Sequence, residues 1–143
     1  MKHHMKLRAQ PFNMIRSGQK TFELRLYDEK RQKVHVGDEI EFSCLDGNEA
    51  PFVVRVTGLH IFDSFAELYS ALPLLKCGYT EETIEDANPD DMNQYYSVEE
   101  QVRYGVVGIE IKLKQSDDPS ITGQQVFEFC ASSQTKSRRY YIR

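Results

Sequence analysis

Thr21-Phe22-Glu23-Leu24-Arg25-Leu26 is the segment in which polar and apolar side chains alternate most regularly. Successive side chains of a β-strand point to opposite faces, so the pattern predicts a strand with its apolar, even-numbered side chains in the core. Thr21, Glu23 and Arg25 then share the other face. Same-face residues two apart lie roughly 6.5–7 Å from each other. Glu23 is therefore placed to orient Arg25 or the neighbouring Lys20, although a solvated polar strand face is an equally good interpretation.

A short helix is predicted immediately before this strand, over residues 11–17. Pro11 suits the first helical position and Gly18 suits a left-handed cap, so the helix delivers the chain to Lys20. Residues 6–10 alternate weakly and are assigned to a first strand. The preceding His3 and His4 are interpreted as part of a mobile start rather than as a metal-binding pair.

The remaining sequence alternates between strand and helix patterns. Residues 39–43 and 52–59 predict two consecutive antiparallel strands, and residues 105–113 predict an inner strand. Ser64 and Ser97 each open a Ser-x-x-Glu capping box, which predicts helices ending before Pro73 and at Tyr104, where Gly105 stops the second. Residues 74–93 are acidic and weakly periodic, with a short helix expected at 80–83, and are interpreted as an excursion or lid.

Composition limits the classes of function. The 143 residues fit one domain, and 40% apolar and 28% charged residues are typical of a globular protein. A net charge of −4 argues against a protein that coats nucleic acid, so any nucleic-acid contact must be local. The sequence contains neither a secretory signal nor a membrane-spanning run, which favours a cytoplasmic protein without a membrane partner.

Cysteines and histidines give weaker signals. The three cysteines, Cys44, Cys77 and Cys130, lack C-x-x-C spacing and are interpreted as reduced thiols. Cys77 would be reactive if exposed, but a buried, inert thiol is the preferred interpretation. His35 and His60 lie far apart in sequence without partners at ligand spacing, so we expect no metal site and no cofactor.

Three motifs in order resemble the ASCH domain, a relative of the PUA domain of RNA-modifying enzymes. They are Gly18-x-Lys20-Thr21-x-Glu23-x-Arg25, Val36-Gly37-Asp38-x-Ile40-x-Phe42 and Tyr104-Gly105-Val106-Val107-Gly108-Ile109. The resemblance covers about residues 6–114. It implies an α+β fold, a small PUA-like β-barrel with flanking helices, as one domain over residues 1–114. It also implies an RNA or nucleoside ligand in a cleft lined by Lys20, Thr21, Glu23 and Arg25.

Residues 115–143 are expected to form a polar C-terminal extension. Its apolar patch, Val126-Phe127-Glu128-Phe129, is compatible with one extra strand. Its basic and aromatic ending is interpreted either as a nucleic-acid arm or, preferably, as a mobile terminus.

Hydrolysis is the second function that the resemblance implies. Some bacterial members are N4-acetylcytidine amidohydrolases in which a lysine activates a threonine nucleophile. Lys20 matches the lysine, but the nucleophile's position, three residues later, is occupied by Glu23. Thr21 is the nearest hydroxyl, and Glu99 and Glu100 are candidates for the third group. Glu23 would instead serve as a general base for water if burial raised its pKa.

The preferred hypothesis is a binding module. Lys20 and Arg25 would hold a phosphate, Glu23 would orient them, and aromatic side chains would stack on a base. The candidate stacking residues are Tyr95, Tyr96 and Tyr104. A third hypothesis is a protein-interaction adaptor that uses the acidic segment at residues 81–91; the sequence identifies no protein partner.

Overall fold

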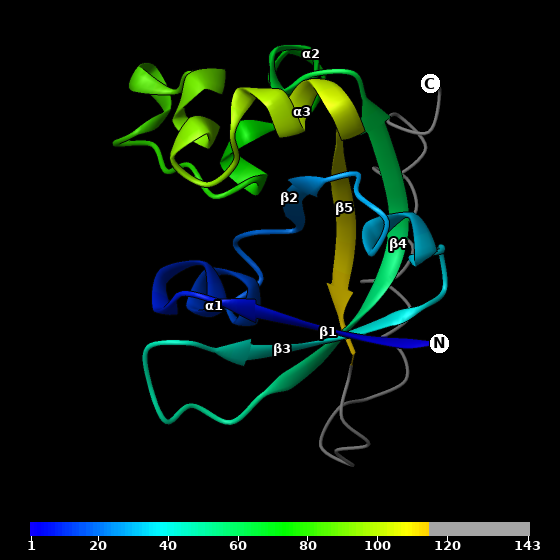
Figure 1. Cartoon of the computed structure of the whole chain (residues 1–143). Coiled ribbons are helices and arrows are strands. Elements are labelled where there is room, and N and C mark those ends of the chain that lie inside the picture. The colour runs from blue at the N-terminus through cyan, green and yellow to red at the C-terminus, as the bar shows by residue number, and fades with distance from the viewer. Residues whose placement is uncertain (115–143) are drawn as a thin grey trace.

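The computed structural model describes residues 1–114, which form a mixed five-stranded sheet curved into a half-barrel with flanking helices (Figure 1). The predicted extension at 115–143 lies outside the described residues. The strands are β1 (Lys2–Leu7), β2 (Phe22–Leu26), β3 (Glu39–Cys44), β4 (Phe52–Phe62) and β5 (Val106–Leu113). The α-helices are α1 (Ala9–Arg16), α2 (Phe65–Ala71) and α3 (Val98–Tyr104), and the 3-10 helices are η1 (Arg31–Lys33), η2 (Leu74–Lys76), η3 (Ile84–Asp86) and η4 (Pro89–Gln94).

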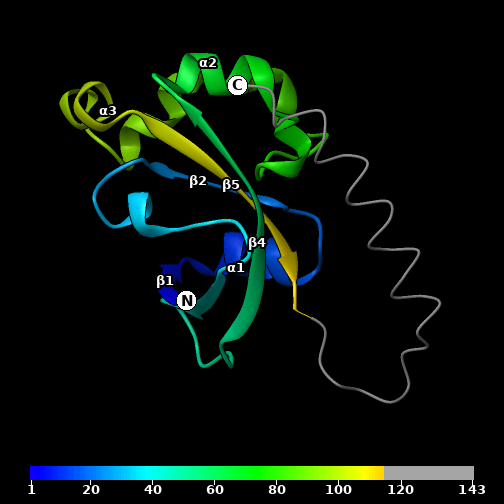
Figure 2. The same ribbon diagram turned by 90° about the vertical axis from the view of Figure 1, so that its right-hand side faces the viewer.

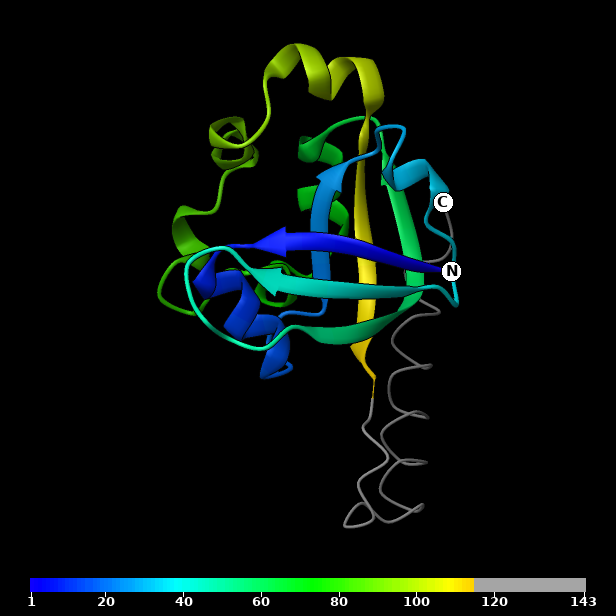
Figure 3. The ribbon, with the colours of Figure 1, turned by 60° about the horizontal axis from the view of Figure 1, so that its bottom comes forward.

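The strand order β1-β3-β4-β5-β2 leaves β1 and β2 as the two edges of the sheet. β1 pairs with β3 in parallel, and the other pairs are antiparallel, which confirms the predicted β3–β4 pair and the inner position of β5. A bulge between Val56 and Gly58 shifts the register of β4, and bulges bend a strand and increase its twist. The curved sheet brings β1 and β3 across the direction of β2 and β5 (Figure 3).

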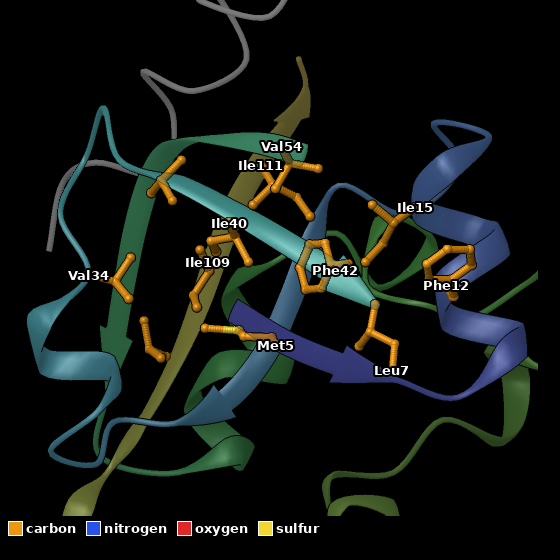
Figure 4. Close-up of a cluster of buried hydrophobic side chains, with 12 residues drawn as sticks. Met5, Leu7, Phe12, Ile15, Val34, Ile40, Phe42, Val54, Ile109 and Ile111 are labelled. Atoms are coloured by element: carbon orange, nitrogen blue, oxygen red, sulfur yellow. The ribbon is translucent and has the colours of Figure 1, made fainter. Parts of the chain in front are cut away.

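Two apolar clusters occupy the two faces of the curved sheet. The first, shown in Figure 4, joins β1, β3, β4, β5 and α1 through side chains such as Met5, Phe42 and Ile109. The second joins β2 and β5 to α2 through Leu24, Leu68 and other apolar side chains. α2 and α3 lie at the end of the molecule opposite α1 and β1 in both Figures 1 and 2.

The apolar row of β2 belongs to the second cluster. Phe22, Leu24 and Leu26 are at most 7% exposed, which confirms that this row is core. It packs toward α2, however, and not into the first cluster. Glu23 lies opposite Ile109 of β5, so the polar row of β2 shares a sheet face with the first cluster. Both faces of this edge strand are therefore covered.

The start of the chain was predicted incorrectly. It forms β1 instead of a mobile segment, and the strand expected at residues 6–10 ends at Leu7. Met5 and Leu7 are buried on the same face as His3, which is 8% exposed. His3 Nε2 lies 2.9 Å from Asp38 Oδ2, so a polar side chain occupies a core position because a carboxylate satisfies it. Because His3 is polar, the alternation of buried and exposed side chains in β1 could not be recognised from the sequence.

Helix boundaries follow the capping signals, with one shift. α1 begins at Ala9, two residues before Pro11, which occupies the first turn where its missing N–H removes no helical hydrogen bond. Gly18 adopts the predicted left-handed conformation, with φ +86°. Ser64 accepts a hydrogen bond from the Glu67 N–H, and Ser97 accepts one from the Glu100 N–H, which confirms both caps.

The acidic excursion between α2 and α3 consists of short 3-10 helices. The helix expected at 80–83 is a turn in which the Thr80 N–H donates to Thr83 Oγ1. Tyr79 OH lies 2.7 Å from Tyr69 OH of α2 and donates to Asp91 Oδ2 at 2.7 Å. These hydrogen bonds and the buried Met92 hold the excursion against α2.

Within residues 1–114, none of the helices has the length and apolar character that crossing a bilayer requires.

Candidate functional site

Glu23 joins Lys20 and Arg25 in a buried ion triplet. Lys20 Nζ donates to Glu23 Oε1 at 2.8 Å, and Arg25 Nε donates to Glu23 Oε2 at 3.0 Å. Arg25 Nη2 lies 2.8 Å from the same Oε2 atom. Glu23 is 3% exposed and Lys20 is 8% exposed. Each oxygen of this buried carboxylate therefore binds a cation. Lys20, before Glu23 in the sequence, binds Oε1, and Arg25, after it, binds Oε2.

The turn after α1 places Lys20. Gly18 reverses the chain, and the Lys20 N–H returns to the carbonyl of Met14 at 3.0 Å. The Lys20 side chain then passes over Gly78, where a Cβ atom would lie 3.8 Å from Nζ. Lys20 is therefore held between the end of α1 and the η2 segment.

Thr21, the next residue, is half-buried, and its backbone is bonded on both sides. Its N–H donates to the carbonyl of Lys76, and its carbonyl accepts from the Ile111 N–H, both at 2.9 Å.

The charges of the triplet stabilise one another. Burial acts to raise the pKa of Glu23, but the charges and hydrogen bonds of Lys20 and Arg25 outweigh it and hold this pKa below its ordinary value. Burial acts to lower the pKa of Arg25, and Glu23 outweighs it, so this pKa is raised. The condition under which Glu23 was expected to act as a general base, a pKa raised by burial, is therefore not met.

Arg25 also connects the two edges of the sheet. Its Nη2 donates to the carbonyl of Lys6 on β1 at 3.1 Å. Lys30, in the segment after β2, donates from Nζ to the carbonyl of His4 at 2.9 Å. Residues two apart on a strand present their backbone groups to the same side, so both cations bind the free edge of β1. We call this junction the β1–β2 seam.

A hollow of about 400 Å³ opens at the seam. Its lining residues are His4, Met5, Lys6, Arg25, Lys30, Arg31 and Ser43. Four of them are cationic at neutral pH and none carries a carboxylate. Of these cations, Arg25 was predicted from the sequence, whereas Lys6, Lys30 and Arg31 were not. The adjacent bases Lys30-Arg31 were a visible signal, but their approach to β1 depends on tertiary structure.

Tyr96 lies near the triplet. Its ring stacks on Phe65, with centroids 6.2 Å apart and planes at 16°. Burial raises the pKa of Tyr96, although the nearby charge of Arg25 acts in the opposite direction. The adjacent Tyr95 is 59% exposed, and its ring centroid is 6.5 Å from that of Tyr96.

The predicted residues of α3 lie outside the triplet. Glu99 and Glu100 are exposed in the first turn, where Glu100 accepts from Ser97 Oγ. In residues 1–114, neither carboxylate forms a hydrogen bond or ion pair with Lys20, Glu23 or Arg25. Tyr104 packs on the second apolar cluster.

A second buried polar pair was not predicted. His60 Nε2 of β4 lies 2.9 Å from Glu110 Oε1 of β5, and the residues are 1% and 8% exposed. His60 therefore lies in the core with a carboxylate partner. No group of three or more His, Cys, Asp or Glu side chains within the described 114 residues is arranged to hold a metal ion.

Cys77 is a buried free thiol. It is 5% exposed, and burial raises its pKa from 9.0 to about 12, although Lys20 acts to lower it. The thiolate is the reactive form, and each pKa unit changes its population tenfold, so we expect native Cys77 to react about a thousandfold more slowly than unfolded Cys77 at pH 8.

The measurement is the rate of iodoacetamide alkylation, followed by mass spectrometry, in the Cys44→Ser/Cys130→Ser variant. Urea-denatured protein provides the reference rate. Similar rates in the native and denatured protein would show that Cys77 is accessible and ionised.

Comparisons with known proteins agree with this fold. Residues 5–115 match the ASCH domain family. The crystal structure of hypothetical protein PH0355 is 33% identical, with a TM-score of 0.68 over 80% of this chain and 100% of that one. The solution structure of protein PF0455 from Pyrococcus furiosus is 31% identical, with a TM-score of 0.63 over 81% of this chain and 100% of that one. A search of curated proteins found no significant match. The chain belongs to the ASCH domain family.

Proposed function

We propose that this chain binds RNA at the β1–β2 seam, with Arg25 as the central contact. The ASCH family is generally thought to bind RNA. The observation that carries the proposal is the hollow itself, lined by four cationic side chains and no carboxylate in a chain of net charge −4. Positive charge is thus concentrated at one concave surface, where it would contact phosphates locally.

Arg25 has donors left for a ligand. Its contacts within residues 1–114 use Nε and Nη2, toward Glu23 and the Lys6 carbonyl. A guanidinium carries five N–H donors, so both N–H groups of Nη1 remain for phosphate or a base edge. Tyr96 lies close enough to Arg25 for their charges to interact, and with its exposed neighbour Tyr95 it is the candidate aromatic surface for stacking on an unpaired base.

Fewer of the predicted cleft residues contact RNA in this proposal. Lys20 and Glu23 are almost completely buried, so in this proposal they fix the Arg25 side chain and do not touch RNA. Thr21 is half-buried and stays a candidate contact to a nucleoside. A fixed guanidinium loses less conformational entropy when it binds phosphate than a free side chain does.

The geometry supports binding better than amide hydrolysis. A lysine that activates a nucleophile must reach a hydroxyl, whereas Lys20 Nζ donates to Glu23 at 2.8 Å. The low pKa of Glu23 also makes it a weak base. Cytidine release from N4-acetylcytidine by the wild type, but not by Lys20→Met, would establish the hydrolase alternative.

Binding to a labelled single-stranded RNA with a 5′-hydroxyl, measured by fluorescence anisotropy, tests the proposal. We expect Arg25→Gln to weaken affinity about 10- to 100-fold, because a charge-assisted hydrogen bond contributes about 1.5–3 kcal/mol. The slope of log affinity against log salt should fall by about 0.7 for each lost phosphate contact.

Arg55→Gln is the matched control, because Arg55 carries the same charge but is exposed on β4 and does not line the hollow. Circular dichroism verifies that each variant is folded. A folded Arg25→Gln protein that binds RNA as tightly as Arg55→Gln would overturn the proposal.

A further inference from the structure

We propose that the hollow at the β1–β2 seam recognises a phosphate monoester, the terminal phosphate of an RNA strand, in preference to an internal phosphodiester. This inference rests on the proposed RNA binding and adds the chemical group that the site selects. It depends on how the four cations are arranged and on which of them lack a carboxylate partner.

Two of the four cations already have carboxylate partners. Arg25 is bound to Glu23, and Arg31 Nη1 lies 3.1 Å from Asp28 Oδ2. No ion pair within residues 1–114 neutralises Lys6 or Lys30. The hollow therefore retains at least two positive charges after its internal pairs are counted.

Lys30 is close to other positive charges. Its Nζ donates to the His4 carbonyl, which holds the ammonium against β1. Burial lowers the pKa of Lys30, and the charges of Arg31 and Arg25 lower it further, whereas Asp28 acts in the opposite direction. Like charges held this close are unfavourable, and an anion between them would relieve the repulsion.

Arg31 supplies an unused donor. Its Nε is buried and, among residues 1–114, has no hydrogen-bond partner. A buried polar atom without a partner costs about 1–3 kcal/mol, so the protein does not fully satisfy the Arg31 guanidinium. Asp28 binds the guanidinium through Nη1 alone, and its other oxygen accepts from the Arg31 backbone N–H. Ser43 and His4 add polar side chains to the lining, and His4 Nδ1 lies 3.1 Å from Glu41 Oε2.

These features fit a monoester better than a diester. A terminal phosphate carries a charge of about −1.5 to −2 at pH 7 and three acceptor oxygens, whereas each internal phosphate carries one charge. A hollow of about 400 Å³ also accepts a terminal phosphate together with its sugar. The two uncompensated cations then match the two charges of the ligand.

Short single-stranded RNAs of one sequence test the inference at constant salt. One carries a 5′-phosphate, one a 3′-phosphate, and one has no terminal phosphate. We expect one of the monophosphorylated strands to bind wild-type protein at least about tenfold more tightly than the unphosphorylated strand, since charge-assisted contacts are roughly twice as strong as neutral ones. The comparison of the two ends identifies the source of the monoester.

Lys30→Gln should remove this gain, so it should weaken binding of the phosphorylated strand much more than binding of the unphosphorylated strand. Lys33→Gln is the matched control, because Lys33 lies in η1, is exposed and does not line the hollow. It should keep the full gain. Equal affinity of wild-type protein for all three strands would overturn the inference while leaving the proposed RNA binding intact.

Inorganic phosphate separates the two proposals if none of the strands binds. It should raise the melting temperature of the wild type and of Lys33→Gln, but not of Lys30→Gln, relative to chloride at equal ionic strength. A phosphate-induced rise in melting temperature that depends on Lys30, without RNA binding, would refute the proposed function but support a phosphate site in the hollow. Absence of that shift would refute the inference itself.

Discussion

Replacing Glu23 with Gln should lower the free energy of unfolding by about 3–5 kcal/mol, the cost of breaking a buried ion pair by removing one partner. The variant keeps the shape of the side chain but removes the charge that both Lys20 and Arg25 require. Lys20 and Glu23 side chains are 10% and 5% exposed, so water cannot replace the lost carboxylate. Two cations would then remain buried beside one neutral amide.

Urea denaturation of the whole chain measures this effect. The control is Glu49→Gln, which breaks the Arg16–Glu49 pair at 2.7 Å, where the two side chains are 46% and 48% exposed. Exposed pairs contribute about 0.2–1 kcal/mol, so this loss should be small. If Glu23→Gln and Glu49→Gln destabilise the protein equally, the triplet does not stabilise the fold.

Replacing both Lys20 and Glu23 separates the contribution of their charges to stability from the contribution of their side-chain packing. Buried ion pairs are often exchanged for apolar residues of similar volume without a loss of stability. Lys20→Met/Glu23→Gln leaves only the Arg25 charge unpaired, so it should be more stable than Glu23→Gln alone. The difference between the two variants measures the cost of the isolated Lys20 ammonium.

The triplet shows how far local sequence determines the site. Strand alternation was sufficient to predict that Glu23 and Arg25 share a face, because side-chain direction in a strand depends only on position. The same rule did not reveal which face lies against α2, since that depends on the partner strand β5. The burial of Glu23 follows from packing that no short pattern encodes.

The seam shows why the rest of the site was missed. Lys6 and Lys30 lie far apart in sequence. They line the same hollow because β1 and β2 are the two edges of one curved sheet. His3 obscured β1 because its burial depends on Asp38, a residue in the turn before β3. Capping signals at Ser64 and Ser97 succeeded because a cap requires only residues within one helical turn.

Gly105→Ala should cost about 3 kcal/mol or more, because two effects add at this position. Gly105 has φ +70° and ψ −171°, a conformation that residues with a Cβ strongly disfavour, and such strain costs about 1–3 kcal/mol. A Cβ atom would also lie 2.9 Å from the backbone carbonyl oxygen of Phe62. Overpacking of this kind typically costs a further 1–3 kcal/mol.

Neither side of Gly105 can move easily to make room. Its N–H donates to the Gln101 carbonyl at 2.9 Å, and its carbonyl accepts from the Tyr27 N–H at 3.0 Å, so α3 and the chain after β2 are both attached to it. Gly18→Ala separates the two costs, because Gly18 has φ +86° but nothing within 4 Å of an added Cβ. It should lose only about 1–2 kcal/mol of unfolding free energy in urea. Equal losses of unfolding free energy in the two variants would mean that the backbone around Phe62 shifts to accommodate the methyl group. Gly105 would then be required at the end of α3 only for its backbone conformation.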